Sequence, residues 1–302
     1  MKVLILSPIK EVITDSFKMK LKGLNVQYIE KSEKLDKVYE LQNNEEKLLV
    51  IDPDFTYNLS REVLEKIPNV KCIILTTTAF SWIDLDYCNE QNIIVCNTPY
   101  FSSEAVAEWA FMSSLALARK VPLVIKNGFE HDYNYTGIEL KNKKCGILGL
   151  GNIGSKFAEL ASGFGMQIQY WSRSDKNSKF SYVTLDELFK SSELLYVSLP
   201  ENAETNELIT DERIKMMQKN ALLTFSSSPK YNKELVLEII KEKKLGGLSF
   251  EGKSNEFNNY EGNVWAAPSL GWCTKESMER NSEMILRNIK DAVKGVYANK
   301  IN

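Results

Sequence analysis

A glycine-rich turn at residues 149–154 is the strongest chemical signal in the sequence. It reads Gly149-Leu150-Gly151-Asn152-Ile153-Gly154 and stands between the apolar run 145–148 and a segment with helical spacing. In such a turn the first glycine permits a tight strand-to-helix connection, the second lets a pyrophosphate approach the backbone, and the third lets the helix pack closely on the sheet. The helix N-terminus adds amide donors and a partial positive charge. The pattern predicts a dinucleotide site that includes Gly149, Gly151, Asn152, Ile153 and Gly154; the alternative is a purely structural turn.

The residues after the next predicted strand, 167–171, bear on which dinucleotide is bound. Near this point an NAD site carries a carboxylate that holds the ribose hydroxyls, whereas this chain reads Ser172-Arg173-Ser174. Ser172 removes the repulsion that a 2′-phosphate would meet, and Arg173, helped by Ser174 and Lys176, can bind that phosphate through charge-assisted hydrogen bonds. The sequence therefore favours NADP(H) over NAD(H), with a solvated basic turn as the alternative.

Alternating apolar and helix-like segments supply the elements that must position this turn. Strand-like runs fall at 3–6, 26–29, 48–51, 72–75 and 93–96, and again at 145–148, 167–171, 194–199, 221–225 and 245–250. Helix-like segments between them include 14–24, 34–43 and 60–67, followed by a long apolar helix at 103–120, an irregular stretch at 121–142 and a final helix at 274–297. Repeated strand-then-helix order predicts an α/β fold with two Rossmann-like, doubly wound parallel-sheet domains and a cleft between them.

Composition narrows the classes of protein that fit. The chain has 302 residues, 43% of them hydrophobic, which is enough for a substantial core and excludes disorder. With 38 Lys plus Arg against 40 Asp plus Glu, the net charge of -2 gives no strong field toward nucleic acid or an anionic membrane. No apolar run approaches the ~20 residues of a membrane helix, so a soluble, cytoplasmic protein is expected.

The cysteines and the single histidine limit metal and acid–base chemistry. The five cysteines are odd in number and far apart, which favours reduced packing residues over disulfides or a metal site. His131 is the sole imidazole, and it lies in the irregular stretch, where packing at a surface or an interface is its ordinary role.

Three motifs together resemble one enzyme family. They are the run 144–154, the pair Asn97-Thr98-Pro99 with Val106-Ala107-Glu108, and Val197-Ser198-Leu199-Pro200. In order and along nearly the whole chain they resemble the D-isomer-specific 2-hydroxyacid dehydrogenases, of the kind represented by glyoxylate and hydroxypyruvate reductases. The resemblance implies a homodimer, a split substrate-binding domain at 1–100 plus 273–302, and a dinucleotide-binding domain at 101–272. In such relatives the linker that contains His131 can reach the neighbouring subunit's cleft.

The resemblance also assigns residues to the cofactor. It implies that Val106 lines the nicotinamide pocket and that several residues at or near the ends of the later strands lie along the cofactor. These residues are Leu199, Pro200, Ser226, Ser227, Glu251 and Gly271.

The substrate-side positions depart from the family pattern. A Ser-Arg-Gly turn, whose arginine grips the substrate, is replaced by Ser227-Ser228-Pro229, and the Pro-His pair that supplies the acid/base imidazole is replaced by Pro268-Ser269. The glycine-rich substrate loop is replaced by residues 76–82, whereas the spacing from Glu251 to Glu256 is kept. These departures indicate an atypical member that lacks the family's catalytic Arg and His.

The losses predict a changed substrate. A positioned general acid contributes roughly 10²- to 10⁴-fold, and a charge-assisted hydrogen bond to a carboxylate contributes ~1.5–3 kcal/mol, so a plain 2-keto acid should react poorly. We expect an NADP(H)-dependent reductase acting on another small carbonyl or imine compound, with Glu256, Ser269 and Ser228 as candidate catalytic residues. The alternative is a catalytically silent relative that binds NADP(H) as a sensor or interaction protein.

Other polar residues have competing interpretations. Lys230 could replace the missing cation, and Tyr231 or Tyr133 could donate a proton, although turn lysines are usually solvated and turn tyrosines usually pack. Trp272 could form a wall of the cleft or belong to the core.

Overall fold

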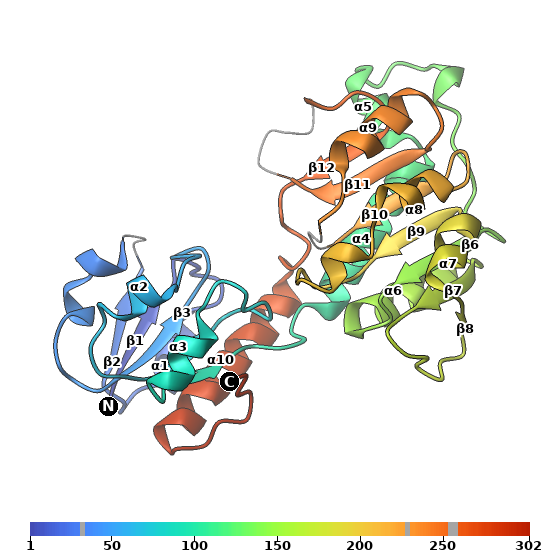
Figure 1. Cartoon of the computed structure of the whole chain (residues 1–302). Coiled ribbons are helices and arrows are strands. Elements are labelled where there is room, and N and C mark those ends of the chain that lie inside the picture. The colour runs from blue at the N-terminus through green and yellow to red at the C-terminus, as the bar shows by residue number, and fades with distance from the viewer. Residues whose placement is uncertain (31–33, 227–229, 253–258) are drawn as a thin grey trace. The chain divides into compact units, whose positions relative to one another are not determined.

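The computed structural model describes residues 1–30, 34–226, 230–252 and 259–302 (Figure 1). These residues form two compact units. Unit 1 combines Met1–Ser102 with Thr274–Asn302, and unit 2 comprises Ser103–Cys273. Each unit contains one parallel β-sheet with helices packed on it, which confirms the expected α/β class with two Rossmann-like parallel sheets.

Unit 2 carries the larger sheet. Its strands are β6 (Lys144–Leu148), β7 (Gln167–Trp171), β8 (Ser181–Tyr182), β9 (Leu194–Val197), β10 (Leu222–Phe225), β11 (Gly247–Glu251) and β12 (Val264–Ala267). They follow the order β12-β11-β10-β9-β6-β7-β8 with every pairing parallel. Because β7 and β8 extend the sheet from one side of β6 and β9 to β12 from the other, the topological switch point lies between β6 and β9. Open α/β sheets bind nucleotides beyond the carboxyl ends of their strands at such a point.

The helices of unit 2 are α4 (Ser103–Ala118), α5 (Val121–Lys126), α6 (Asn152–Gly163), α7 (Leu185–Ser191), α8 (Asp211–Met216) and α9 (Lys233–Lys241), with 3₁₀ turns η3 (Tyr133–Tyr135) and η4 (Thr205–Glu207). The apolar helix α4 is buried along most of its length and packs on α6 and on β10 to β12. Inside this layer Phe157 stacks on Tyr196 with 3.8 Å between ring centroids and meets Phe111 edge to face. Aromatic packing therefore fixes α6 against the sheet and against α4.

The segment after α4 differs from expectation. The prediction that 121–142 is irregular is wrong for residues 121–126, which form α5. Lys120 adopts a left-handed conformation with φ 53°, so α4 cannot continue, and Pro122 lies in the first turn of α5, where its missing N–H is tolerated.

Unit 1 has a five-stranded parallel sheet in the order β2-β1-β3-β4-β5. Its strands are β1 (Lys2–Leu6), β2 (Val26–Ile29), β3 (Lys47–Ile51), β4 (Val70–Leu75) and β5 (Ile94–Cys96); its helices are α1 (Asp15–Lys20), α2 (Arg61–Leu64), α3 (Leu85–Glu90) and α10 (Lys275–Val293), with 3₁₀ turns η1 (Leu35–Lys37) and η2 (Tyr39–Leu41). The single helix predicted at 34–43 is therefore wrong, because Val38 is extended with ψ 104° and separates η1 from η2.

The C-terminal helix α10 completes the N-terminal sheet. Ile285 and Ile289 are fully buried in the same core cluster as residues of β1, β3 and β4. Asn281 donates from its amide to the carbonyl oxygen of Thr76 at 3.0 Å, and Asn288 donates to that of Asn97 at 2.9 Å. Unit 1 thus forms from the two ends of the chain.

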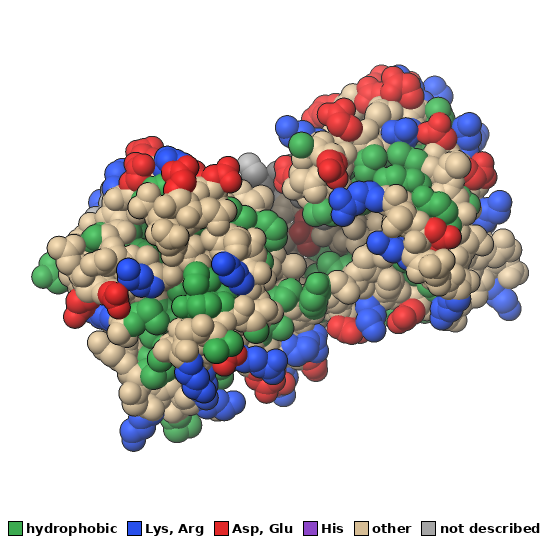
Figure 2. All heavy atoms as spheres, turned by 60° about the horizontal axis from the view of Figure 1, so that its bottom comes forward, with side chains coloured by type: hydrophobic (Ala, Val, Ile, Leu, Met, Phe, Trp, Pro, Cys, Tyr) green, Lys and Arg blue, Asp and Glu red, His purple; other side chains and the backbone are tan. Residues whose placement is uncertain are grey.

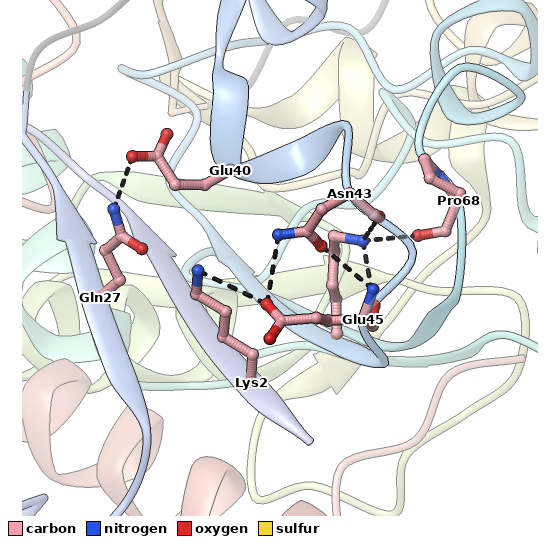
Figure 3. A network of polar contacts seen from close by, with 7 residues as sticks. Lys2, Gln27, Glu40, Asn43, Glu45 and Pro68 are labelled. Atoms are coloured by element: carbon pink, nitrogen blue, oxygen red, sulfur yellow. Dashed lines mark hydrogen bonds and ion pairs between the residues drawn. The ribbon is translucent and has the colours of Figure 1, made fainter.

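A buried lysine stabilises one end of the unit 1 sheet. Lys47 is fully buried at the start of β3, and its ammonium group donates to the carbonyl oxygens of Asn43, Glu45 and Pro68, the last two at 3.0 and 2.9 Å (Figure 3). Three backbone acceptors around one ammonium fix the loops that precede β3 and β4.

Acidic and basic side chains are interspersed over the visible face of each unit (Figure 2). Among the residues that the structure describes, no helix combines the length and apolar composition needed to span a bilayer.

Candidate functional site

The glycine turn joins β6 to α6 in the geometry expected from its spacing. Gly149 has φ +99°, and a Cβ at this position would lie 2.7 Å from the carbonyl oxygen of Ser198. A Cβ on Gly154 would lie 2.1 Å from the carbonyl oxygen of Gly149, so only glycine lets α6 start this close to the turn. The N–H of Gly149 donates to the carbonyl of Trp171, and that of Ser198 to the carbonyl of Leu148, both at 2.9 Å. The turn is therefore held by the strands on either side.

Gly151 has a different surrounding. A Cβ added there would meet nothing within 4 Å, and Gly151 is the N-cap of α6 without a side chain to bond the first amides of the helix. Gly151 also lines a cavity of about 270 Å³ bounded by the glycine turn, the segment after β7 and the loop after β9. An uncapped helix N-terminus beside open space is what a pyrophosphate requires. The residues present therefore fit a dinucleotide.

The segment after β7 carries the residues predicted to select the cofactor. Ser172 is buried, and its hydroxyl oxygen accepts a hydrogen bond from the N–H of Leu150 at 2.9 Å, which ties the strand end to the glycine turn. Arg173 lines the cavity with its side chain 85% exposed, and its Nη1 lies 3.3 Å from Oε2 of Glu204. Lys176 also lines the cavity, whereas Ser174 does not. Lys176 is thus a cation that an anion in the cavity could reach, whereas Arg173 is held in an ion pair by Glu204.

The loop after β9 contributes residues that sequence reasoning missed beyond the predicted Leu199 and Pro200. Asn202, Glu204 and Thr205 all line the cavity. Thr205 donates from its hydroxyl to the carbonyl of Pro200 at 2.6 Å, and its N–H donates to Oδ1 of Asn202 at 3.0 Å, so the loop is compact. The available signal was Asn202 and Thr205, two polar residues three positions apart in the loop that follows a strand, a pattern typical of a turn whose side chains bond its own backbone.

A second polar cluster lies at the carboxyl ends of β11 and β12. The hydroxyl of Ser269 donates to Oε2 of Glu251 at 2.7 Å, and the N–H of Gly271 also hydrogen-bonds the Glu251 carboxylate. Burial raises the pKa of Glu251 by more than these two hydrogen bonds lower it. A Cβ on Gly271 would lie 3.3 Å from Oε1 of Glu251 and 3.2 Å from Trp109, so glycine permits this close approach. Glu251 and Gly271, expected along the cofactor, and Ser269, expected as a catalytic residue, therefore form one hydrogen-bonded cluster.

Tyr196 and Ser226 extend this polar edge across β9 and β10. The phenol oxygen of Tyr196 lies 2.5 Å from Oγ of Ser226. Burial raises the pKa of Tyr196 to about 12, and the negative charge of Glu251 adds to that rise. Tyr196 is therefore a neutral hydrogen-bonding group at neutral pH.

The other predicted residues divide into three groups. Asn152 and Ile153 form the first turn of α6, and Val106 is buried in α4. Ser227, Ser228 and Glu256 lie outside the described residues, so their predicted roles stay predictions.

The alternative proton donors and the alternative cation make packing and backbone contacts that do not require a catalytic role. Tyr231 stacks on Phe225 with centroids 4.3 Å apart, and burial raises its pKa. His131 is exposed and meets Tyr133 edge to face at 4.8 Å. Lys230 is exposed, and its backbone N–H donates to Oδ1 of Asn206 at 2.9 Å. In the described parts of the chain no group of three or more His, Cys, Asp or Glu side chains could hold a metal ion, and the five cysteines are free, four of them buried.

The strand order, the glycine turn and the cavity above it define a dinucleotide-binding α/β protein. The family model of the D-isomer specific 2-hydroxyacid dehydrogenase NAD binding domain matches residues 111–271. Glyoxylate reductase of Thermococcus litoralis is 30% identical over 261 residues, which is 80% of this chain and 79% of that protein. The chain belongs to the D-isomer specific 2-hydroxyacid dehydrogenase family, and the resemblance expected from its motifs is confirmed.

Solved structures show the same fold over the whole chain. D-lactate dehydrogenase from Aquifex aeolicus, complexed with NAD and lactic acid, is 26% identical with a TM-score of 0.82 over 97% of this chain and 96% of that one. An acyclic imino acid reductase in complex with NADPH and D-Arg is 23% identical with a TM-score of 0.86 over the full length of both chains.

Proposed function

We propose that this protein is an NADP(H)-dependent reductase that transfers hydride between the nicotinamide and a small carbonyl or imine compound other than a typical 2-keto acid. Its family supports the oxidoreductase class. The cavity supports the cofactor: Arg173 and Lys176 line it, and the strand end carries Ser172 where an NAD site has a carboxylate.

The chain's own residues have distinct tasks toward that cofactor. Gly151 and the first amides of α6 bind the pyrophosphate, and Arg173 with Lys176 binds the 2′-phosphate. Leu199 and Pro200 form the wall contributed by the loop after β9. When bound, the cofactor supplies the hydride. Unit 2 is the dinucleotide-binding domain in this proposal, and unit 1 supplies the substrate-binding part.

The substrate class follows from the residues that replace the family pattern. Without the arginine of the Ser-Arg-Gly turn, a substrate carboxylate loses the partner that offsets its desolvation. Without the imidazole, a 2-keto acid loses its general acid, a loss of roughly 10²- to 10⁴-fold. A protonated imine needs less help of this kind. The acyclic imino acid reductase with NADPH shows that this fold accommodates imine chemistry.

The test is NADPH and NADH oxidation with a panel of 2-keto acids, aldehydes and cyclic imines. We expect turnover with NADPH and with a carbonyl or imine acceptor, and Arg173→Gln should weaken NADPH binding about 10-fold while leaving NADH binding unchanged. Lys215→Gln, which removes an exposed positive charge on α8 away from the cavity, is the matched control. Cofactor binding without any turnover would instead favour the silent sensor.

We also propose that the protein is a cytoplasmic homodimer. The segment 129–141 and α4 residues line a second hollow of about 970 Å³ that includes Arg119, His131 and Phe164. A second copy of the chain suits this open, mixed polar and apolar surface. Light scattering should give a mass near twice 34.5 kDa, and a monomer at micromolar concentration would refute the dimer.

A further inference from the structure

The Glu251–Ser269 pair has the geometry of a proton relay. Ser269 is exposed, so its hydroxyl is open to solvent and to a small molecule, whereas the Glu251 carboxyl is half-buried behind it. The two oxygens are 2.7 Å apart, and the N–H of Gly271 fixes the carboxyl in place. An accessible hydroxyl is therefore coupled to a carboxyl that has limited contact with water.

Reduction of a carbonyl or a neutral imine needs such a group. The carbon gains a hydride, and the oxygen or nitrogen gains one proton. A serine hydroxyl is too weak an acid to supply that proton unless a neighbouring group replaces it as it leaves. Ser269 occupies the position at which the family pattern has its imidazole, and Glu251 is the group bonded to it.

We propose that Glu251 is the proton donor of the reaction and that Ser269 relays its proton. As the O–H bond of Ser269 breaks toward the acceptor's oxygen or nitrogen, the carboxyl proton of Glu251 passes to Oγ of Ser269 and re-forms that bond. Glu251 is left as a carboxylate and is reprotonated from solvent. Oxidation runs the same transfers in reverse, with Glu251 as the base. This inference rests on the proposed reductase function.

The surroundings of Glu251 favour the protonated form of its carboxyl. Burial raises the pKa of its carboxyl above the ordinary range of glutamate. On the facing strands, Tyr196 of β9 is the titratable group whose pKa the charge of Glu251 raises; it is neutral and hydrogen-bonded to Ser226 of β10. Ser269 and the N–H of Gly271 approach from the segment after β12, and the uncharged Trp109 lies beside Gly271 from α4.

Glu251 and Ser269 also lie at the carboxyl edge of the sheet, where the nicotinamide end of a bound dinucleotide is expected. In the strand order, β11 is three strands from β6 on the side away from β7. At about 4.8 Å per strand, the end of β11 lies about 14 Å from the glycine turn along the same carboxyl edge. A dinucleotide extends across this edge on both sides of the switch point. With Arg173 after β7 holding the adenosine end, the opposite end points toward β11 and β12.

Two measurements test the relay. The first is turnover with NADPH, using a carbonyl or neutral imine and, as a second acceptor, a permanently charged N-methyl cyclic iminium that needs no proton. Glu251→Gln and Ser269→Ala should each lower kcat with the first acceptor by 10²- to 10⁴-fold. Each should lower the iminium rate far less, so the ratio of the two rates measures the lost proton transfer, and Glu251→Asp should recover part of that loss. Glu242→Gln, an exposed glutamate paired with Lys244, is the control for charge.

The second measurement needs no turnover. Carboxyl ¹³C NMR of the protein labelled at glutamate, assigned with Glu251→Gln, should show a pKa of the Glu251 carboxyl above the usual value of glutamate. This pKa should rise further in Ser269→Ala, because a hydrogen bond to the carboxylate is lost. A wild-type enzyme that turns over while Glu251→Gln retains its rate overturns the relay and leaves the reductase standing. A protein without turnover refutes the reductase. In that case a Glu251 carboxyl that titrates as an ordinary glutamate and is insensitive to Ser269→Ala overturns the relay as well.

Discussion

Arg173 and Glu204 form an ion pair at the cofactor cavity, with Nη1 of the arginine 3.3 Å from Oε2 of the glutamate. The two side chains come from different loops, after β7 and after β9, and both are largely exposed. An exposed ion pair contributes little to stability. The pair instead affects anion binding in the cavity, because Glu204 competes with a bound anion for Arg173.

Replacement of Glu204 should therefore strengthen NADPH binding. In Glu204→Gln, Arg173 is released and the repulsion toward a 2′-phosphate disappears, so we expect NADPH to bind roughly 3- to 10-fold more tightly, about 1 kcal/mol, with NADH little changed. Fluorescence titration of each cofactor measures this, and Glu207→Gln, which does not line the cavity, serves as the control. Weaker binding of both cofactors would mean that Glu204 holds the ribose hydroxyls, and the NADP(H) preference would then be wrong.

Two glycines of the same turn should separate stability from binding. Gly154→Ala places a Cβ 2.1 Å from a backbone oxygen, so we expect the free energy of unfolding of unit 2 to fall by about 1–3 kcal/mol. Gly151→Ala meets open space and has φ -88°, so thermal stability should change by less than about 1 kcal/mol.

Gly151→Ala should nevertheless weaken cofactor binding at least about 10-fold, because the added methyl occupies the space where a pyrophosphate approaches the backbone. Calorimetric unfolding of the free protein and cofactor titration separate the two effects. Normal NADPH affinity in Gly151→Ala would contradict the placement of the pyrophosphate.

The parts of the site that could be predicted from the sequence are those with a local cause. The roles of Gly149 and Gly154 follow from one strand, one turn and one helix that are contiguous in the chain. Ser172 could be placed because it directly follows the strand after the glycine turn, and parallel strands bring their carboxyl ends to one edge. Leu199 was expected along the cofactor only from the family resemblance.

The Glu251–Ser269 pair has no such local cause. It depends on the register of β11 with β12, in which Glu251 lies opposite Ala267, and β12 itself was not among the predicted strands. Val264–Ala267 is short and precedes a proline, so its pattern alone does not distinguish a strand from a loop. The Arg173–Glu204 pair depends similarly on the folding of the loop after β9, where Thr205 bonds back to Pro200.

The buried Lys47 makes a prediction for unit 1. Lys47→Met keeps most of the side-chain volume but leaves three backbone carbonyl oxygens without their donor. We expect the free energy of unfolding of unit 1 to fall by about 3 kcal/mol, because unsatisfied buried acceptors each cost about 1–3 kcal/mol and part of the loss is recovered by water. Lys71→Met removes an exposed lysine 3.8 Å from Glu46 and should change stability by less than about 1 kcal/mol. Hydrogen exchange of the β3 amides measures both losses of stability. Equal losses for the two substitutions would contradict the stabilising role of the three hydrogen bonds from Lys47 to backbone carbonyls.

Asp52 should make the stability of unit 1 depend on pH in an unusual direction. It is buried at the end of β3, where Thr76 donates to its carboxylate at 2.7 Å and the N–H of Asp54 donates at 2.9 Å. Burial, with a smaller contribution from the charge of Asp54, raises its pKa from 3.8 to about 6. Between about pH 4 and pH 6 the folded state holds this proton more tightly than the unfolded state, so stability falls as the pH rises through that range, by about 3 kcal/mol in total. Asp52→Asn mimics the protonated form, since its amide can donate to Thr76 and its oxygen can accept from Asp54.

The variant should match the wild type near pH 4 and exceed it by up to about 3 kcal/mol above about pH 7, when the wild-type carboxylate is ionised in both states. Hydrogen exchange of β1 and β3 amides at several pH values gives the difference between the two proteins, which removes the titration of all other groups. Asp86→Asn, which replaces an exposed aspartate on α3, is the control for the loss of one negative charge. A constant difference between wild type and Asp52→Asn across this range would show that Asp52 titrates as an ordinary carboxyl, because only a carboxyl whose pKa differs between the folded and unfolded states produces a slope.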